Sequence, residues 1–395
     1  MSSERVQASV NLAAIERNCT TLRSHLREGA SLCAVVKADG YGHGAVASAR
    51  AALAGGARWL AVVSSAEAHE LRGAALREPP VLVMGALTGD ELREALAASA
   101  DVVVWRERHV DEVAAAGGGR VHVKLDSGMG RLGTRDAGEA TRTAELAART
   151  AGVELVGLMT HFATADEAGD GGFFQAQLDA FARWAHEVKQ RQPQTIAHAA
   201  NSAAVLRDAR SHFDMVRCGI AVYGMDPFGE DAAAQGLEPA LELVSYVAEV
   251  KRVRAGESAG YGRRFVAEAD AYLGVLPIGY GDGWRRGLSG NADVLIAGRR
   301  YPLVGTVSMD NITVLLGDEE EAQSLRGESA VLIGAQGEER ISAEEVARRL
   351  DTINYEVTCA LSARVPRAYH RDGVHSAGAS SGGAGEPAAA GAERG

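Results

Sequence analysis

The sequence lacks several features that mark specialised classes of protein. Its 395 residues contain no run of about 18 apolar residues, the length that a membrane-spanning helix requires. Aromatic residues make up only 5% of the sequence. The formal net charge is -11 and there is no basic stripe, which argues against nucleic-acid binding. The opening residues MSSERVQASV have no apolar segment like that of a secretory signal. We therefore expect a soluble enzyme that stays in the cytoplasm.

Cysteine is also scarce and is not arranged for metal or disulfide chemistry. The four cysteines are Cys19, Cys33, Cys218 and Cys359, without CxxC or other metal-ligand spacing. We expect buried, reduced thiols, and we predict neither a metal site nor a disulfide.

Lysine is the scarcest charged residue. Of 41 basic residues only four are lysine, namely Lys37, Lys124, Lys189 and Lys251. A lysine amine can lose its proton and form a Schiff base, which a guanidinium cannot do, so its chemistry matters in a chain that otherwise uses arginine. Lys189 and Lys251 stand in polar contexts typical of a surface, whereas Lys37 ends an apolar run in AVVKADGYGHG.

Eight short β-branched runs alternate with Ala-rich helical stretches between residues 30 and 225. The runs are SLCAVVK, RWLAVV, PVLVMG, DVVVW, RVHVKLD, VELVGLMT, TIAHAA and FDMVRCG. Repeated strand–helix units imply a parallel sheet, and eight of them favour a closed barrel over an open doubly wound sheet. We predict an α/β fold whose N-terminal (β/α)8 TIM-type barrel spans residues 1–238.

After Glu238 the pattern changes to strands with few helices. We predict a mainly β C-terminal domain over residues 239–372, with one clear helix in SAEEVARRL, where Ser342 is the expected N-cap and Glu345 follows three residues later. Residues 373–395 are rich in Gly, Ala and Ser and contain too few large apolar residues to form a core. We expect a disordered tail there.

Reactive side chains stand where the predicted barrel strands end. They are, in chain order, Lys37, Arg131, His161, Asn201, Ser202 and Arg217. In barrels of this type the working residues lie at the C-terminal ends of the strands and on the loops that follow. At that rim the Lys37 amine could form an imine with a carbonyl compound or could simply reach into water, and its position alone leaves both interpretations open.

Two short motifs near the rim suggest phosphate or nucleotide binding. Ser202 and the backbone N–H groups of Gly219 and Ile220 could hold a phosphate, because such donors after late barrel strands form a recurrent anion site. The segment GMGRLG at 128–133 fits the dinucleotide pattern GxGxxG. Four strands precede it, however, and the next strand ends at His161 and not at an acidic residue. We therefore do not expect a nicotinamide cofactor.

Nine motifs, in order along the chain to about residue 372, resemble those of the alanine racemase family. They are AVVKADGYGHG, KLDSGMGRLG, THFATAD, HAANSA, MVRCGIAVYG, SAGYGRRF, LPIGYGDGW, VGTVSMDN and INYEVTCALSARVPR. The resemblance implies a fold-type III pyridoxal 5'-phosphate enzyme, an isomerase that interconverts L- and D-alanine and supplies D-alanine for peptidoglycan. It also implies a head-to-tail homodimer in which the partner subunit completes each active site.

The resemblance assigns roles to the residues at the barrel rim. Lys37 would carry the cofactor as a Schiff base and serve as one catalytic base. Arg217 would face the pyridine nitrogen, and Arg131 would lie beside the cofactor's phenolic oxygen and the substrate carboxylate. Lys124 matches a lysine that is carbamylated in some members, although it could equally remain a plain cation. The other expected cofactor contacts are Tyr41, His161, Asn201, Ser202, Gly219, Ile220 and Tyr355.

A second set of matched residues lies in the predicted β domain and would reach the active site of the partner subunit. Tyr261 matches the second catalytic base. Inverting a carbon by proton removal needs a base on each face, because one base tends to return the proton to the face it left. His161 and His198 would connect Tyr261 with Arg217 through hydrogen bonds. The expected substrate-entry and substrate-binding residues of this set are Tyr280, Met309 and Asp310.

Three other functions compete with this assignment. A racemase of broader specificity, for example one that acts on serine, would share every motif. A non-catalytic pyridoxal-phosphate-binding protein would have the barrel and the lysine but would end after the barrel, so residues 239–372 argue against it. A decarboxylase of the same fold type would carry a Gly-rich phosphate loop and a partner-subunit cysteine motif, and we find neither in the sequence.

Overall fold

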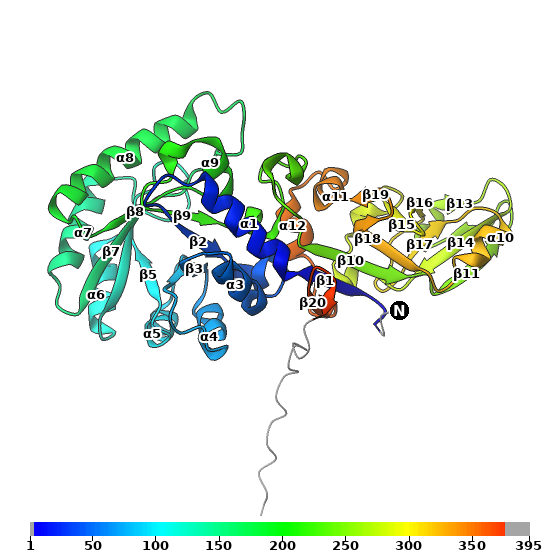
Figure 1. Ribbon diagram of the computed structural model, residues 1–395, viewed down its shortest axis with the longest axis horizontal. Coiled ribbons are helices and arrows are strands. Elements are labelled where there is room, and N and C mark those ends of the chain that lie inside the picture. The colour runs from blue at the N-terminus through cyan, green and yellow to red at the C-terminus, as the bar shows by residue number, and fades with distance from the viewer. Residues whose placement is uncertain (1–3, 376–395) are drawn as a thin grey trace, which may run out of the picture.

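The computed structural model describes residues 4–375, which form a barrel and a mainly β region lying side by side (Figure 1). This architecture confirms the predicted fold class. Most of the expected tail, residues 373–395, lies outside the described residues. Its first residues contain a short strand, β21 (Val374–His375), which pairs with β20 (Arg367–Arg371).

Eight parallel strands close the barrel. They are β2 (Ser31–Val35), β3 (Trp59–Val62), β4 (Val81–Val83), β5 (Asp101–Val104), β6 (Gly119–Lys124), β7 (Val153–Met159), β8 (Ile196–His198) and β9 (Met215–Cys218). Each coincides with one of the eight predicted runs. The last strand pairs with the first, with Cys33 opposite Arg217. Continuous apolar runs suit these strands because a parallel barrel buries both faces of its sheet.

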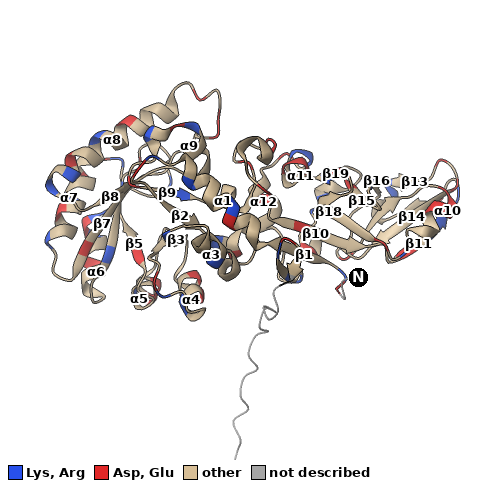
Figure 2. Cartoon of the chain, viewed as in Figure 1, with Lys and Arg blue, Asp and Glu red and all other residues tan. Residues whose placement is uncertain are grey.

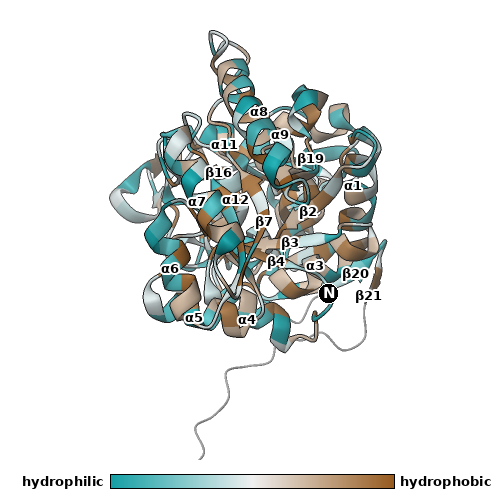
Figure 3. Cartoon of the chain, turned by 90° about the vertical axis from the view of Figure 1, so that its left-hand side faces the viewer, coloured by the Kyte–Doolittle hydropathy of each residue, from teal (hydrophilic) through white to brown (hydrophobic). Residues whose placement is uncertain are grey.

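Helices surround the barrel strands. They are α1 (Leu12–His25), α3 (Ala45–Ala54), α4 (Ser65–Gly73), α5 (Gly89–Ala97), α6 (Glu107–Ala115), α7 (Ala137–Arg149), α8 (Phe173–Arg191) and α9 (Ser202–Arg207). Figure 3 shows hydrophobic strands inside this ring of helices, and Figure 2 shows that acidic and basic residues both occur on the outer helices α6, α7 and α8. Helices α4 and α5 both begin with capping boxes.

The second region is built around a large twisted sheet. Its strand order is β11-β14-β17-β16-β15-β18-β10-β1-β20-β21, and β19 pairs with β18. The strands not yet given are β1 (Gln7–Asn11), β10 (Leu241–Tyr246), β11 (Glu249–Val253), β14 (Ala271–Leu276), β15 (Asp293–Ile296), β16 (Arg299–Val304), β17 (Ile312–Leu315), β18 (Ser329–Gln336) and β19 (Glu339–Ile341). A separate hairpin consists of β12 (Ser258–Ala259) and β13 (Phe265–Val266), and the helices are α10 (Glu319–Ser324), α11 (Ala343–Arg349) and α12 (Asn354–Cys359). Helix α11 is the predicted one, and the Ser342 side chain caps it by accepting from the Glu345 N–H.

The first strand of the chain belongs to this second sheet and not to the barrel. Strand β1 pairs antiparallel with β10 and parallel with β20, although it lies within the range 1–238 expected to form the barrel domain. Its side chains alternate between buried and half-buried, which is typical of a sheet with one wetter face, whereas barrel strands are buried on both faces. The division between residues 238 and 239 stays a prediction.

Three features of the described residues bear on the chemistry. No helix in residues 4–375 is both long enough and apolar enough to cross a membrane. The same residues contain no cluster of three or more His, Cys, Asp and Glu side chains that could hold a metal ion. All four cysteines are free, but Cys359 is exposed, so the expectation of a buried thiol was wrong there. Cys359 ends α12 and lines the cavity at the barrel mouth, where no side chain covers it fully.

Candidate active site

The chain makes an unusual turn where the first barrel strand ends. The turn, labelled α2 (Lys37–Tyr41), contains four consecutive residues with positive φ: Ala38 at 53°, Asp39 at 52°, Gly40 at 59° and Tyr41 at 55°. A left-handed conformation costs an L-residue roughly 1–2 kcal/mol, so the surroundings must hold this turn in place. Lys37 and Tyr41, at the two ends of this turn, line the same cavity.

That cavity lies at the mouth of the barrel and has a volume of about 660 Å³. The ends of β2, β6, β7, β8 and β9 and the segments that follow them supply most of its polar wall, as expected for a barrel of this type. It brings together all the barrel residues predicted to bind the cofactor or to support that site, and it adds Tyr355, the predicted residue of α12. These are Lys37, Tyr41, Lys124, Arg131, His161, Asn201, Ser202, Arg217, Gly219, Ile220 and Tyr355.

The cavity has a strongly positive wall. Burial, and then the charge of Arg131, lower the pKa of Lys37. Lys124 is only 4% exposed, and its amine has no hydrogen-bond partner among residues 4–375. Burial, together with the charges of Arg217 and Arg131, lowers the pKa of Lys124 to about 8. Four basic side chains therefore face one space without a carboxylate on its wall, which suits an anionic guest.

Arg217 is held rigidly beneath the cavity. Its Nη1 donates to His198 Nδ1 over 2.7 Å, and its Nη2 donates to the Thr160 carbonyl over 2.7 Å and lies 3.2 Å from His161 Nδ1. Burial lowers the pKa of Arg217 to about 10, which still leaves it charged at neutral pH. Burial and the Arg217 charge push the pKa of both histidines well below the ordinary value, so both rings are neutral. A fixed guanidinium with neutral neighbours can donate hydrogen bonds without giving up a proton.

The hydrogen bonds continue from Arg217 into the barrel core, through residues that the sequence did not reveal. His198 Nε2 lies 2.8 Å from His122 Nδ1, and His122 Nε2 lies 3.1 Å from Asp101 Oδ2. Because His198 Nδ1 accepts from Arg217, its Nε2 carries the proton and donates to His122, which in turn donates to Asp101. The only sequence signal was a polar residue inside each of the apolar runs DVVVW and RVHVKLD.

Another part of the cavity wall consists of hydroxyl and backbone groups. Ser202 Oγ accepts from the Gly219 N–H at 3.1 Å and from the Ala221 N–H at 3.3 Å. A Cβ atom at Gly219 would lie 2.2 Å from Tyr41 Oη, so only glycine allows that hydroxyl to approach. The Tyr41 and Tyr355 rings lie 6.0 Å apart on the same wall. The hydroxyls of Tyr41, Tyr355 and Ser202 thus share the cavity with the cations, and together these groups fit a phosphate.

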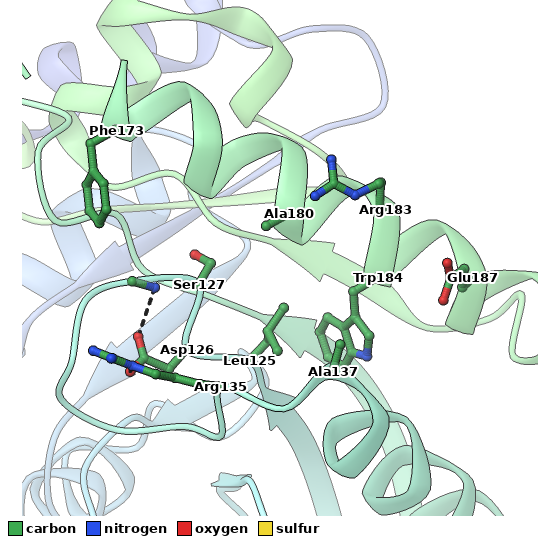
Figure 4. Close-up of a pocket in the computed structure, with 11 residues that line it drawn as sticks. Leu125, Asp126, Ser127, Arg135, Ala137, Phe173, Ala180, Arg183, Trp184 and Glu187 are labelled. Atoms are coloured by element: carbon green, nitrogen blue, oxygen red, sulfur yellow. Dashed lines mark hydrogen bonds and ion pairs between the residues drawn. The ribbon is translucent and has the colours of Figure 1, made fainter. Parts of the chain in front are cut away.

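The loop that carries Arg131 is held in place by contacts to the Asp126 carboxylate. Asp126 accepts hydrogen bonds from the N–H groups of Gly128 and Gly130 and pairs with Arg135. Figure 4 shows Asp126 beside Arg135. Burial opposes ionisation of Asp126, but these hydrogen bonds outweigh it and keep the pKa of Asp126 below its usual value. A cleft of about 520 Å³ separates this loop from α8 (Figure 4). The loop therefore takes its shape from its own carboxylate and, at Gly128, from close packing against Phe173 of α8.

The remaining predicted site residues gather elsewhere, in the β region. Tyr261, Tyr280, Met309 and Asp310 line a second cavity of about 510 Å³, which we call the β-region patch. Tyr261 is 71% exposed and lies between β12 and β13, a hairpin that is remote from the barrel mouth in Figure 1. Within one chain, His161 contacts Arg217 and not Tyr261, so the predicted link between His161 and Tyr261 stays a prediction.

Comparisons with known proteins cover both regions. Residues 10–227 match the family model described as alanine racemase, N-terminal domain, and residues 240–369 match alanine racemase, C-terminal domain. The chain is 39% identical over 377 residues to alanine racemase 1 of Bacillus subtilis, covering 93% of each chain. It is 40% identical over 370 residues to the alanine racemase of Geobacillus stearothermophilus, covering 92% of this chain and 93% of the relative.

Solved structures give the same result. The crystal structure of alanine racemase from E. faecalis matches with a TM-score of 0.85 and 36% identity, covering 93% of this chain and 98% of that one. The alanine racemase of Streptomyces lavendulae, which produces D-cycloserine, matches with a TM-score of 0.87 and 37% identity, covering 94% and 98%.

Proposed function

This chain belongs to the alanine racemase family, and from that premise we propose that it interconverts L- and D-alanine with pyridoxal 5'-phosphate bound at the barrel mouth. The observation that carries the proposal is the position of Lys37. Its amine, with a lowered pKa, faces a cavity that also holds Arg131, Arg217 and the Ser202 hydroxyl. The alanine racemase of Bacillus anthracis, which matches with a TM-score of 0.86, has been solved with bound L-Ala-P.

The residues of the cavity fit this cofactor. Lys37 would bind it covalently through its amine, and Arg217 would donate a hydrogen bond to its ring nitrogen. When bound, pyridoxal phosphate withdraws electrons and so makes the α-proton of alanine more acidic. The substrate carboxylate would bind beside Arg131. The phosphate would be held by Tyr41, Ser202, Gly219, Ile220 and Tyr355, with Asn201 and His161 as further wall contacts.

Two bases move the proton in this proposal. The Lys37 amine takes the α-proton from D-alanine, and Tyr261 of the partner subunit takes it from L-alanine, each from its own face. Tyr280, Met309 and Asp310 of the partner subunit would line the substrate entrance. The Arg217 guanidinium stays protonated throughout, because its pKa of about 10 lies well above neutral pH.

The proposal requires a homodimer. A catalytic tyrosine must be shielded from bulk water to act on a bound substrate, yet Tyr261 is 71% exposed and Met309 is 51% exposed. A second copy whose barrel mouth faces the β-region patch would bury both residues. We therefore propose a head-to-tail dimer in which the barrel mouth of one chain, with Tyr355 of that same chain, and the β-region patch of the other chain form each site.

Mixing two inactive variants tests this arrangement. Lys37→Ala and Tyr261→Phe chains should each be inactive alone, and a mixture with proven subunit exchange should regain activity. About a quarter of all sites should be native, because half of the dimers are hybrids with one intact site of two. No recovery would contradict the shared site. Tyr246→Phe, at another exposed tyrosine, is the matched control and should behave like the native protein.

We also propose that Lys124 is carbamylated. With a pKa of about 8, a useful fraction of its amine is neutral and can attack CO₂, releasing one proton and forming a carbamate. The product would be an anion between Arg131 and Arg217, in place of a third cation. A ¹³C carbamate signal from labelled bicarbonate should disappear in Lys124→Ala and persist in Lys189→Ala. If the native protein gives no such signal, Lys124 is a plain cation.

The physiological part of the proposal is a cytoplasmic supply of D-alanine for peptidoglycan. Substrate breadth is tested by a chiral assay of the purified protein with alanine, serine and a few larger amino acids. Racemisation of serine at a rate equal to that of alanine would favour a broader racemase of the same family.

A further inference from the structure

Glu67 is the acidic side chain that reaches the strained turn from the neighbouring barrel unit. Its Oε1 accepts a hydrogen bond from the Ala38 N–H at 2.7 Å, and its Oε2 accepts from the Val63 N–H at 2.7 Å and from the Ser64 N–H at 3.2 Å. One carboxylate thus joins the residue after Lys37 to the end of β3. Both Ala38 and Val63 also line the cavity at the barrel mouth.

We propose that Glu67 is a positioning residue for Lys37, an inference that rests on the proposed function. The turn needs such a support, because Ala38 begins a run of five residues with positive φ that ends at Gly42, and L-amino acids rarely adopt this conformation. Ala38 and Lys37 are adjacent, so a rotation of the backbone at Ala38 swings the Lys37 side chain away from the cavity. The negative charge of Glu67 also favours the charged form of Lys37.

Glu91 is a matched control for the role of Glu67 in capping a helix. Glu67 closes the capping box of α4 with Ser64, and Glu91 closes the same kind of box at α5 with Thr88. The carboxylate of Glu91 accepts from Thr88 alone, whereas that of Glu67 also reaches Ala38. A purely structural role predicts equal consequences for the same substitution at both positions.

Glu67→Gln should loosen the turn, because its amide has one acceptor oxygen in place of two and carries no charge. In the holoenzyme we expect hydrogen exchange of the peptide covering residues 36–42 to accelerate by about tenfold, and kcat to fall by about 10- to 100-fold with KM nearly unchanged, since small misplacements of a reacting group are costly. Glu91→Gln should leave both readouts at native values. Both variants should lower Tm by similar amounts.

Further results distinguish a failure of the positioning role of Glu67 from a failure of the proposed function. Equal exchange and equal kcat in Glu67→Gln and Glu91→Gln would overturn the positioning role. Glu67→Asp, which keeps the charge but is one methylene shorter, should show the same fast exchange as Glu67→Gln, and native exchange in that variant would also contradict the proposal. The exchange readout does not depend on racemisation. If the native chain has no racemase activity, the proposed function fails while the exchange comparison still decides whether Glu67 fixes the turn.

Discussion

The barrel mouth and the β-region patch both contain reactive residue types, but the two regions differ in burial and in hydrogen bonding. The barrel-mouth residue Arg217 is buried and hydrogen-bonded within one chain, whereas the patch residue Tyr261 is exposed. At the barrel mouth Arg217 is 3% exposed and is hydrogen-bonded to two histidines and two backbone carbonyls. In the patch Tyr261 is 71% exposed and its hydroxyl has no partner among residues 4–375. Under the proposed function, one chain would supply the cofactor-binding residues by itself, and its Tyr261 would act as the second base only once a partner subunit covers the patch.

The exposure of the patch does not mean that it is loose. The Tyr280 N–H donates to the Ser308 carbonyl at 3.0 Å, and the Gly281 N–H donates to the Met309 carbonyl at 2.9 Å. Nearby, Arg364 pairs with Asp310. The patch is therefore preorganised before any partner binds, which lowers the entropic cost of forming a complex.

Replacement of Lys37 has the largest expected effect. It removes the reactive amine of the barrel mouth and leaves the β-region patch unchanged. Lys37→Ala should lower racemase activity by about 10³-fold or more, since it deletes both the covalent attachment point and one base. It should also abolish the imine absorbance near about 420 nm. A cofactor that borohydride still links to the variant would contradict the role of Lys37. Lys189→Ala, which removes a surface ion pair with Asp214, is the control.

The next substitution tests the patch alone. Tyr261→Phe should slow proton abstraction from L-alanine by about 10²- to 10⁴-fold and affect D-alanine far less, because each base serves one face. Single-turnover exchange in deuterated solvent measures both directions. The cofactor absorbance should be unchanged, because the barrel mouth is complete without Tyr261. An equal loss in both directions would argue against two separate bases.

The smallest expected effect is on stability and concerns His43, which lies beneath the lysine turn. Its Nδ1 lies 3.1 Å from the Gly40 carbonyl and 3.0 Å from the Tyr41 carbonyl, and burial lowers its pKa to about 4. Between about pH 6.5 and pH 4 the unfolded chain binds a proton that the folded chain does not, so stability falls as the pH falls. The loss should reach about 3 kcal/mol at pH 4.

Denaturant titrations between pH 7 and pH 4 measure this loss. His43→Asn should remove the His43 share of this pH dependence, while the buried His161 and His198, whose pKa values are also lowered, keep theirs. His69→Asn, at an exposed position, should leave the pH dependence unchanged. An unchanged slope in His43→Asn would show that another group controls acid unfolding. Above pH 6.5 neither form of the chain binds the proton, so His43 adds no pH dependence there.

The sequence predicted the parts of the molecule that depend on local pattern. The eight barrel strands and the Ser342 cap follow from periodicity and capping chemistry, and the rim residues follow because a strand end is visible in sequence. His122 and Asp101 could not be predicted, because they meet His198 only when the barrel closes. Likewise, the left-handed conformation of Ala38, Asp39 and Tyr41 could not be predicted, because residues other than glycine rarely adopt it.

The pairing of β1 has a consequence for how the chain is made. Ala8 of β1 pairs with Arg367 of β20, so β1 finds its parallel partner only after the barrel and most of the β region have been synthesised. The barrel strands all pair with near neighbours in sequence except at the closure between β2 and β9, and they can assemble earlier. Contacts between distant segments form slowly because a long loop must close first. We therefore expect β1 to pair with β10 first and its other edge to stay open during synthesis, until β20 can pair with it.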